Sequence, residues 1–106
     1  MKVEITKDAE KMLVALYRVY LSRRKDGQSK QEARRYNDGY FVETDPFSKM
    51  HPTDVSDTQL ELAQSGLLKV YIGGDCELTD HAIVYLENRF KNGLNEVIAF
   101  ITQFIP

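Results

Sequence analysis

The sequence predicts a single domain, residues 1–106, that is mainly α-helical with a small β-hairpin (α+β). Apolar residues recur at the spacing of one helical face over several long stretches. The apolar and partly β-branched run Leu67–Ile72 is followed by the turn residues Gly73, Gly74 and Asp75, as in a hairpin. With 42% hydrophobic and 28% charged residues, the chain has the composition of a globular domain that folds without a disulfide framework.

The first predicted helix runs from Lys7 to about Arg24 and is amphipathic. Thr6 can cap its beginning, since a threonine oxygen accepts a hydrogen bond from a backbone N–H of the first turn. Basic residues near its end suit the negative pole of the helix dipole, and Gly27 stops it. Its buried face is expected to consist of Ala9, Met12, Leu13, Leu16, Tyr17, Tyr20 and Leu21.

A short second helix is predicted from Ser29 to about Tyr36. Ser29 and Glu32 have the spacing of a capping box, and Tyr36 faces inward. The stretch 40–52 allows two interpretations. Residues 40–42 are compatible with a short strand, whereas the prolines that follow favour an irregular loop held by buried aromatic side chains.

A third helix is predicted after Pro52, with Thr53 or Ser56 as its cap and Gly66 as its end. Leu62 lies on its predicted buried stripe, so we expect it in the core. The outward positions of this helix are polar and include three carboxylates: Asp54, Asp57, Thr58, Glu61, Gln64 and Ser65.

The last predicted helix begins at Leu94 and carries an apolar arc wider than one packing seam needs. We therefore expect a homodimer. Its predicted interface consists of Val97, Phe100, Ile101 and Phe104. The alternative is that Phe100 packs over Tyr40 and Phe41 and completes a monomeric core.

The order of the elements matches one known layout. Residues 76–78 can return antiparallel to the first hairpin strand, and Thr79 can cap a fourth helix. Three helices followed by a two-stranded hairpin and a further helix is the layout of the winged helix-turn-helix fold. The chain would then be a winged helix with an extra C-terminal amphipathic helix.

Local segments also resemble this superfamily. Residues 62–68 (LAQSGLL) resemble the junction between a recognition helix and a wing, and residues 77–87 (ELTDHAIVYLE) resemble an ending common in such proteins, with Ala82 where glycine is commoner. The helix order and residues 95–101 (NEVIAFI) look most like the YjcQ-like proteins, uncharacterised small proteins of Gram-positive bacteria and their phages. The resemblance implies a fold more specifically than a function.

Charge is unevenly distributed along the chain. Residues 1–37 carry ten basic and five acidic side chains, a net +5, whereas residues 38–106 carry four and eleven, a net −7. An uneven distribution of this kind indicates either a nucleic-acid surface or a solvated helix pair. If double-stranded DNA is bound, the predicted contacts lie at the junction of the first two helices: Arg23, Arg24, Lys25, Lys30, Arg34 and Arg35.

No catalytic constellation is found in the sequence. Cys76 and His81 lack a second cysteine or histidine at ligand spacing, so a buried thiol beside a surface histidine is expected instead of a metal site. The chain is thus predicted to be no enzyme and to use no cofactor. Its single cysteine favours a reducing cytoplasm, and no stretch is long enough to span a bilayer.

Two hypotheses follow from these features. The first is a non-enzymatic winged-helix protein that acts as a DNA-associated regulator or accessory factor of bacterial or phage origin. The second is an adaptor with the same fold that binds an unidentified protein partner and no nucleic acid. The carboxylates of the third helix count against the first hypothesis, because they would face a polyanion without a neighbouring cation.

Overall fold

The computed structural model describes residues 3–103. The chain is mainly helical with a small antiparallel sheet, which confirms the predicted α+β class. The elements in chain order are α1 (Lys7–Lys25), α2 (Lys30–Ala33), β1 (Arg35–Tyr36), α3 (Tyr40–Glu43), the 3₁₀ turn η1 (Phe47–Lys49), α4 (Pro52–Gln64), β2 (Leu68–Val70), β3 (Cys76–Leu78), α5 (Asp80–Arg89) and α6 (Leu94–Thr102).

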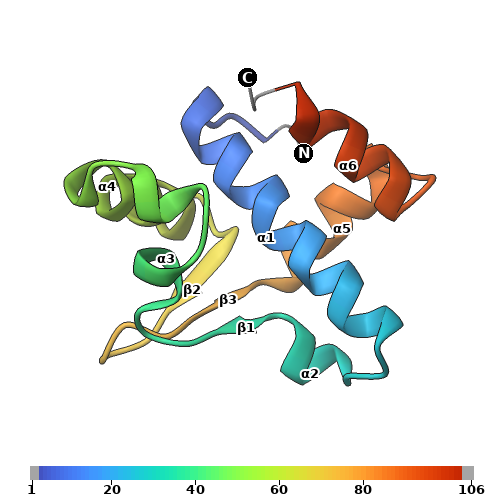
Figure 1. Ribbon diagram of the computed structural model, residues 1–106, viewed down its shortest axis with the longest axis horizontal. Coiled ribbons are helices and arrows are strands. Elements are labelled where there is room, and N and C mark those ends of the chain that lie inside the picture. The colour runs from blue at the N-terminus through green and yellow to red at the C-terminus, as the bar shows by residue number, and fades with distance from the viewer. Residues whose placement is uncertain (1–2, 104–106) are drawn as a thin grey trace.

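Helix α1 crosses the middle of the molecule and separates two groups of elements (Figure 1). On one side lie α3, α4 and the hairpin formed by β2 and β3, and on the other side lie α5 and α6. This arrangement leaves one face of α4 and the short helix α3 beside the hairpin.

Within residues 3–103 the sheet has three strands in the order β1-β3-β2, one more than the predicted hairpin. The additional strand is β1, in which Arg35 lies opposite Glu77 and Tyr36 opposite Cys76. The prediction that the second helix continues to Tyr36 was therefore wrong, because α2 ends at Ala33. Pairing with β3 satisfies backbone groups that another helical turn would otherwise have satisfied.

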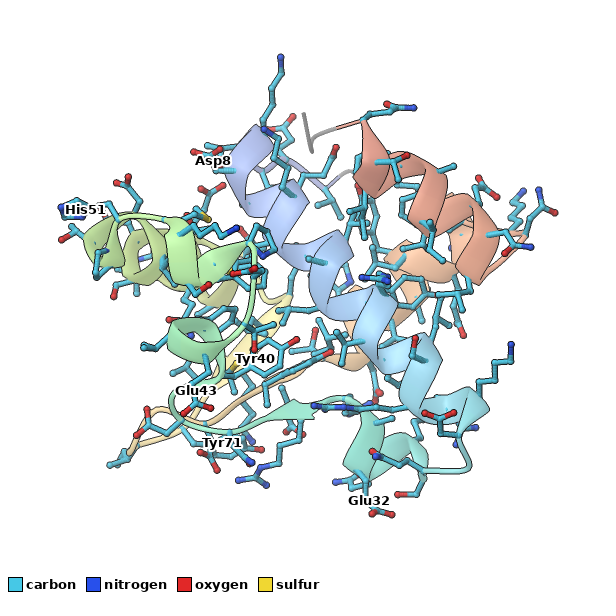
Figure 2. The ribbon with its side chains drawn as sticks, viewed as in Figure 1. Asp8, Glu32, Tyr40, Glu43, His51 and Tyr71 are labelled. Atoms are coloured by element: carbon cyan, nitrogen blue, oxygen red, sulfur yellow. The ribbon has the colours of Figure 1, made fainter. Side chains whose placement is uncertain are left out.

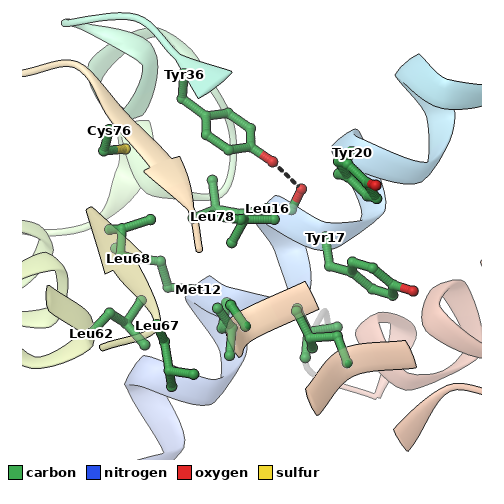
Figure 3. Close-up of a cluster of buried hydrophobic side chains, with 14 of the residues drawn as sticks. Met12, Leu16, Tyr17, Tyr20, Tyr36, Leu62, Leu67, Leu68, Cys76 and Leu78 are labelled. Atoms are coloured by element: carbon green, nitrogen blue, oxygen red, sulfur yellow. Dashed lines mark hydrogen bonds between the residues drawn. The ribbon is translucent and has the colours of Figure 1, made fainter. Parts of the chain in front are cut away.

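The core surrounds α1; one part lies between α1 and the sheet (Figure 3), and another is formed with residues of α5 and α6. Leu16, Tyr17 and Tyr20 are buried, as predicted for this face, whereas Leu21 is only partly buried. Tyr36 of β1 and Leu62 of α4, which were also predicted to face inward, are buried with them. The Tyr36 hydroxyl donates a hydrogen bond to the carbonyl oxygen of Leu16, which is drawn as a dashed line in Figure 3. This bond gives the buried phenol a partner and joins β1 to α1.

Three of the predicted caps are confirmed. Thr6 accepts a hydrogen bond from the Ala9 amide, Ser29 from the Glu32 amide, and Thr79 from the Ala82 amide. In each case the side-chain oxygen satisfies a backbone donor of the first helical turn that has no partner within the helix. Because these signals are local, the sequence was sufficient to place them.

The beginning of α4 differs from the prediction. Its cap is His51, whose Nδ1 accepts from the Thr53 amide at 3.2 Å, and Pro52 occupies the first turn. Thr53 and Ser56 therefore lie within the helix. Proline fits the first turn because its missing N–H would have no helical partner there.

The stretch before α4 is neither a strand nor an irregular loop alone, since it forms the single turns α3 and η1. Buried aromatic rings hold it, as the loop interpretation predicted. The rings of Phe41 and Phe47 meet edge to face at 4.9 Å between centroids, and Tyr40 meets Phe41 at 5.5 Å. Gly39, at φ +87°, supplies the left-handed residue at which α3 begins.

Helix α6 packs against α1. Val97 is fully buried within its own chain, so its side chain leaves no surface for a second copy. Phe100 packs edge to face on Phe90 at 5.5 Å, whereas the monomeric alternative predicted contacts with Tyr40 and Phe41. Ile101 is half-buried against the core, and Phe104 lies outside the described residues. Self-association through α6 stays a prediction with a smaller candidate surface.

Candidate functional site

The six predicted phosphate-binding residues, here named the basic junction, do come together around α2 and the adjacent end of α1, but most have other partners. Arg23 Nη1 donates to the carbonyl oxygens of Arg35 at 2.6 Å and Ala33 at 3.4 Å. Its guanidinium also lies 5.0 Å from the centroid of the Tyr36 ring. Arg23 therefore connects the end of α1 to β1.

Lys30 and Arg34 both contact the carboxylate of Asp80 at the beginning of α5. Arg34 Nη1 lies 2.5 Å and Lys30 Nζ 3.7 Å from its Oδ1. Arg34 also lies against the half-buried Glu77, with Nε 3.9 Å from Oε2, and only 13% of its side chain is exposed. These two cations are thus compensated by two carboxylates of the acidic part of the chain.

Arg35 is compensated in the same way. Its Nη2 lies 3.5 Å from the Asp75 carboxylate, and its guanidinium lies 4.6 Å from the centroid of the Tyr71 ring. Of the basic junction, only Arg24 and Lys25 are exposed without an ion pair among residues 3–103; Arg24 donates to the carbonyl oxygen of Gln28 at 3.1 Å. Two such cations form a much smaller positive surface than the six that the sequence suggested.

The outward face of α4 remains acidic, with two changes from the prediction. Thr58 is buried and donates to the carbonyl oxygen of Asp54 at 2.7 Å, so it does not face outward. Glu61 accepts two hydrogen bonds of 2.7 Å, from the amide and the hydroxyl of Thr6. Glu61 thus links α4 to the beginning of α1, whereas Asp57 stays exposed.

A groove of about 450 Å³ lies between α3, η1, α4 and the hairpin, and we name it the apolar groove. Figure 2 shows this side of the molecule, with Glu43 on α3 and His51 at the outer end of α4. Asp38 is the only ionisable residue of the described chain that lines it. The lining consists of Asp38, Gly39, Phe41, Val42, Phe47, Ser48, Met50, Pro52, Val55, Ser56, Gln59, Leu60, Ala63, Val70 and Gly74.

The rim of the apolar groove carries exposed aliphatic side chains from three different elements. Val42 of α3 is 78% exposed, Leu60 of α4 is 56% exposed and Val70 of β2 is 45% exposed. Single exposed aliphatic residues need no explanation, but several around one concave apolar surface are typical of a binding site. Small-molecule sites usually enclose most of their ligand, whereas an open rim of this kind can accept side chains from the surface of a macromolecule.

Sequence reasoning missed the apolar groove. The residues of α4 that line the groove form a stripe along the helix, next to the stripe that faces the core. In the sequence alone, Leu60 cannot be distinguished from a single exposed leucine without a function. Val42 and Val70 belong to other elements, and only the fold brings them to the same rim. The available signal was the mixture of small and apolar residues on two adjacent faces of α4.

Cys76 and His81 are the remaining side chains that the sequence singled out for possible chemistry. Cys76 is buried, and burial raises the pKa of its thiol to about 11, which disfavours the reactive thiolate. Within the range 3–103, no three side chains of the metal-binding types are grouped as ligands. In the same range, no helix is long and apolar enough to cross a membrane.

Comparisons with protein-family models, with curated proteins and with solved structures find no match to this chain.

Proposed function

We propose that this chain is a non-enzymatic interaction module of winged-helix type that binds a partner protein in the apolar groove. The winged-helix part is supported by the element order and by the strand order β1-β3-β2, in which the middle strand is the second arm of the hairpin. In that reading α4 is the helix that other members of the superfamily place in the DNA major groove. Here the same helix forms one wall of the apolar groove.

One contrast favours a protein partner over DNA. Most cations of the basic junction have partners within the chain, whereas the aliphatic side chains at the rim of the apolar groove are exposed. Three of the six residues of the basic junction pair with carboxylates, and two others, Arg23 and Arg24, donate to backbone carbonyls. Nucleic-acid affinity depends mainly on cations that can neutralise phosphates, so this surface would bind DNA weakly. The rim residues Val42, Leu60 and Val70 instead provide the aliphatic contacts of a protein interface.

Selection of binders from a random peptide library tests this function, because it requires no knowledge of the natural partner. We expect peptides that bind the unmodified chain and lose binding to the double variant Val42→Thr/Leu60→Gln. The matched control is Val84→Thr/Ile98→Gln, which makes the same replacement types at exposed aliphatic positions of α5 and α6. Peptides that bind both variants equally well, or no peptides at all, would contradict the proposal.

DNA binding is the second candidate, favoured by the two exposed cations Arg24 and Lys25. If DNA is bound through them, the double variant Arg24→Ala/Lys25→Ala should lower affinity for random duplexes. It should also reduce the slope of log K against log salt by about 2, since each lost phosphate contact removes about 0.9. A mobility shift measured at several salt concentrations decides this, and no shift at low salt excludes the candidate.

A further inference from the structure

We infer that the occupant of the apolar groove is an amphipathic helix of a partner protein, with lysine or arginine beside its apolar stripe. This inference rests on the proposed function and adds the chemistry of the partner. It follows from the charges around the groove and from the shape of its walls.

The carboxylate of Asp38 is held at the hairpin end of the groove. The Asp38 amide donates to Asp75 Oδ1 at 2.8 Å, which fastens the loop before α3 to the hairpin turn. The carboxylate then lies over Gly74, where an added Cβ would approach Asp38 Oδ1 to 2.3 Å. Because Gly74 has no side chain, the Asp38 carboxylate can occupy this space. The glycine at position 74 thus makes room for Asp38 as well as forming part of the hairpin turn.

A second carboxylate lies on the α4 side. Asp57 is exposed and stands three residues before Leu60, so the two side chains are neighbours on the helix surface. Within residues 3–103, neither Asp38 nor Asp57 has an ion-pair partner. Glu43 follows the rim residue Val42 and is also exposed without such a partner in this range.

No cation of the described chain compensates these carboxylates. Lys49 lies near the groove but contacts Asp45 at 3.6 Å, and the Lys69 ammonium lies 4.9 Å from the centroid of the Tyr71 ring. The groove thus combines an apolar floor with unpaired negative charge at its edges. The complementary ligand has apolar anchors and positive flanks, because opposite charges at a rim favour association and like charges oppose it.

The walls favour a helix over an extended segment. Residues of α4 line one side along the helix and residues of α3 and η1 line the other. Addition of an extended strand would require a free sheet edge, and the outer strand β2 is only three residues long, Leu68–Val70. A helix instead presents apolar residues at i, i+3, i+4 and i+7, which is the recurring way of filling a groove of this kind.

Three synthetic peptides of about 18 residues test the inference, with binding measured by fluorescence anisotropy. The first has a leucine stripe at helical spacing flanked by lysines, the second has glutamates in place of the lysines, and the third is the lysine peptide with two central prolines. We expect the lysine peptide to bind at least about 10-fold more tightly than each of the others, because only it combines helix formation with positive charge.

Variants of the chain assign the charge effect to the groove. Asp38→Asn/Asp57→Asn should weaken binding of the lysine peptide about 3- to 10-fold, as expected for the loss of two exposed ion pairs. The matched control Asp26→Asn/Glu87→Gln removes two exposed carboxylates elsewhere and should leave binding unchanged. Val42→Thr/Leu60→Gln should weaken binding of every peptide that enters the groove.

The outcomes separate this inference from the proposed function. Equal, groove-dependent binding of the lysine and glutamate peptides overturns the inference about charge and leaves the interaction function standing. Equal binding of the proline peptide overturns the helix and indicates an extended ligand. Equal weakening by the control pair Asp26→Asn/Glu87→Gln shows that charge acts through the whole molecule and also overturns it. If Val42→Thr/Leu60→Gln changes nothing, the groove is not the binding site and both proposals fail.

Discussion

Two leucines of α4, two residues apart, test the assigned orientation of this helix. Leu62 is 0% exposed and belongs to the core, whereas Leu60 is 56% exposed on the rim of the apolar groove. Leu62→Ala and Leu60→Ala make the same chemical change in the same helix. Their difference in unfolding free energy therefore reports burial and little else.

The expected magnitudes follow from these environments. Leu62→Ala should cost about 2 to 5 kcal/mol, the range found when a buried leucine is truncated and a cavity remains. Leu60→Ala should cost less than about 1 kcal/mol, because more than half of its side chain is already in water. The higher helix propensity of alanine reduces the second cost slightly further.

Chemical denaturation of both variants in urea, followed by circular dichroism, measures the difference. In a thermal melt, Leu62→Ala should lower Tm by on the order of 10 to 30 °C and Leu60→Ala by less than about 8 °C. Equal costs for the two substitutions would mean that α4 is rotated relative to the core. The apolar groove would then have different walls, and the proposals built on it would be refuted.

Three further predictions concern other parts of the molecule. Tyr36→Phe should cost about 0.5 to 1.5 kcal/mol in denaturation, since it removes only the hydrogen bond to the Leu16 carbonyl, and no loss would show that this bond is absent in solution. Burial raises the pKa of Tyr17 to about 12 and that of Cys76 to about 11, so these groups lose their protons at lower pH in the unfolded chain than in the folded one. The free energy of unfolding should therefore fall as pH rises from about 9 to 12, and a flat profile contradicts this. If α6 mediates self-association, sedimentation should show a dimer at micromolar concentration that Phe100→Ser dissociates, and a monomer throughout refutes it.

The elements that sequence analysis predicted correctly are those whose signals are local. Helix α1, helix α5 and the hairpin have caps, apolar spacing and turn residues within a few positions of one another. The capping box of Ser29 and Glu32 was equally sufficient to begin α2. Such signals depend on neighbouring residues, which the sequence shows directly.

The elements that it missed depend on partners far along the chain. Strand β1 is two residues long and exists because Arg35 and Tyr36 meet residues 76–77 of β3. Nothing near Tyr36 distinguishes this from a last helical turn. Thr58 was misplaced for a different reason, because its hydroxyl is satisfied by the Asp54 carbonyl and so tolerates burial on a helix.

The candidate site illustrates the same division. The sequence grouped the cations of the basic junction, but it could not show that Asp80 compensates Arg34 from 46 positions away. It also could not show that Val42 and Leu60 would share one rim. Charge counts and periodicity describe composition along the chain, whereas a binding surface is defined by which groups remain unpaired after folding.

The uneven charge of the sequence acquires a structural explanation in these contacts. The basic first third and the acidic remainder meet where α2 and β1 lie beside the hairpin and the beginning of α5. The ion pairs there join three basic residues, Lys30, Arg34 and Arg35, to three acidic residues, Asp75, Glu77 and Asp80. Arg89 and Glu10 form an ion pair in the opposite sense, with Arg89 Nη1 2.6 Å from Glu10 Oε2. Here the basic residue comes from the acidic part of the chain and the acidic residue from the basic part.

Carboxylates without an ion pair in the described part of the chain remain at the apolar groove. Asp38 and Asp57 have no ion-pair partner in the described part of the chain, although the same fold supplies cations to Asp75 and Asp80. The charge pattern that first suggested a DNA surface therefore supports a partner of the opposite sign, because the cations are used within the fold and the unpaired carboxylates border an exposed apolar surface.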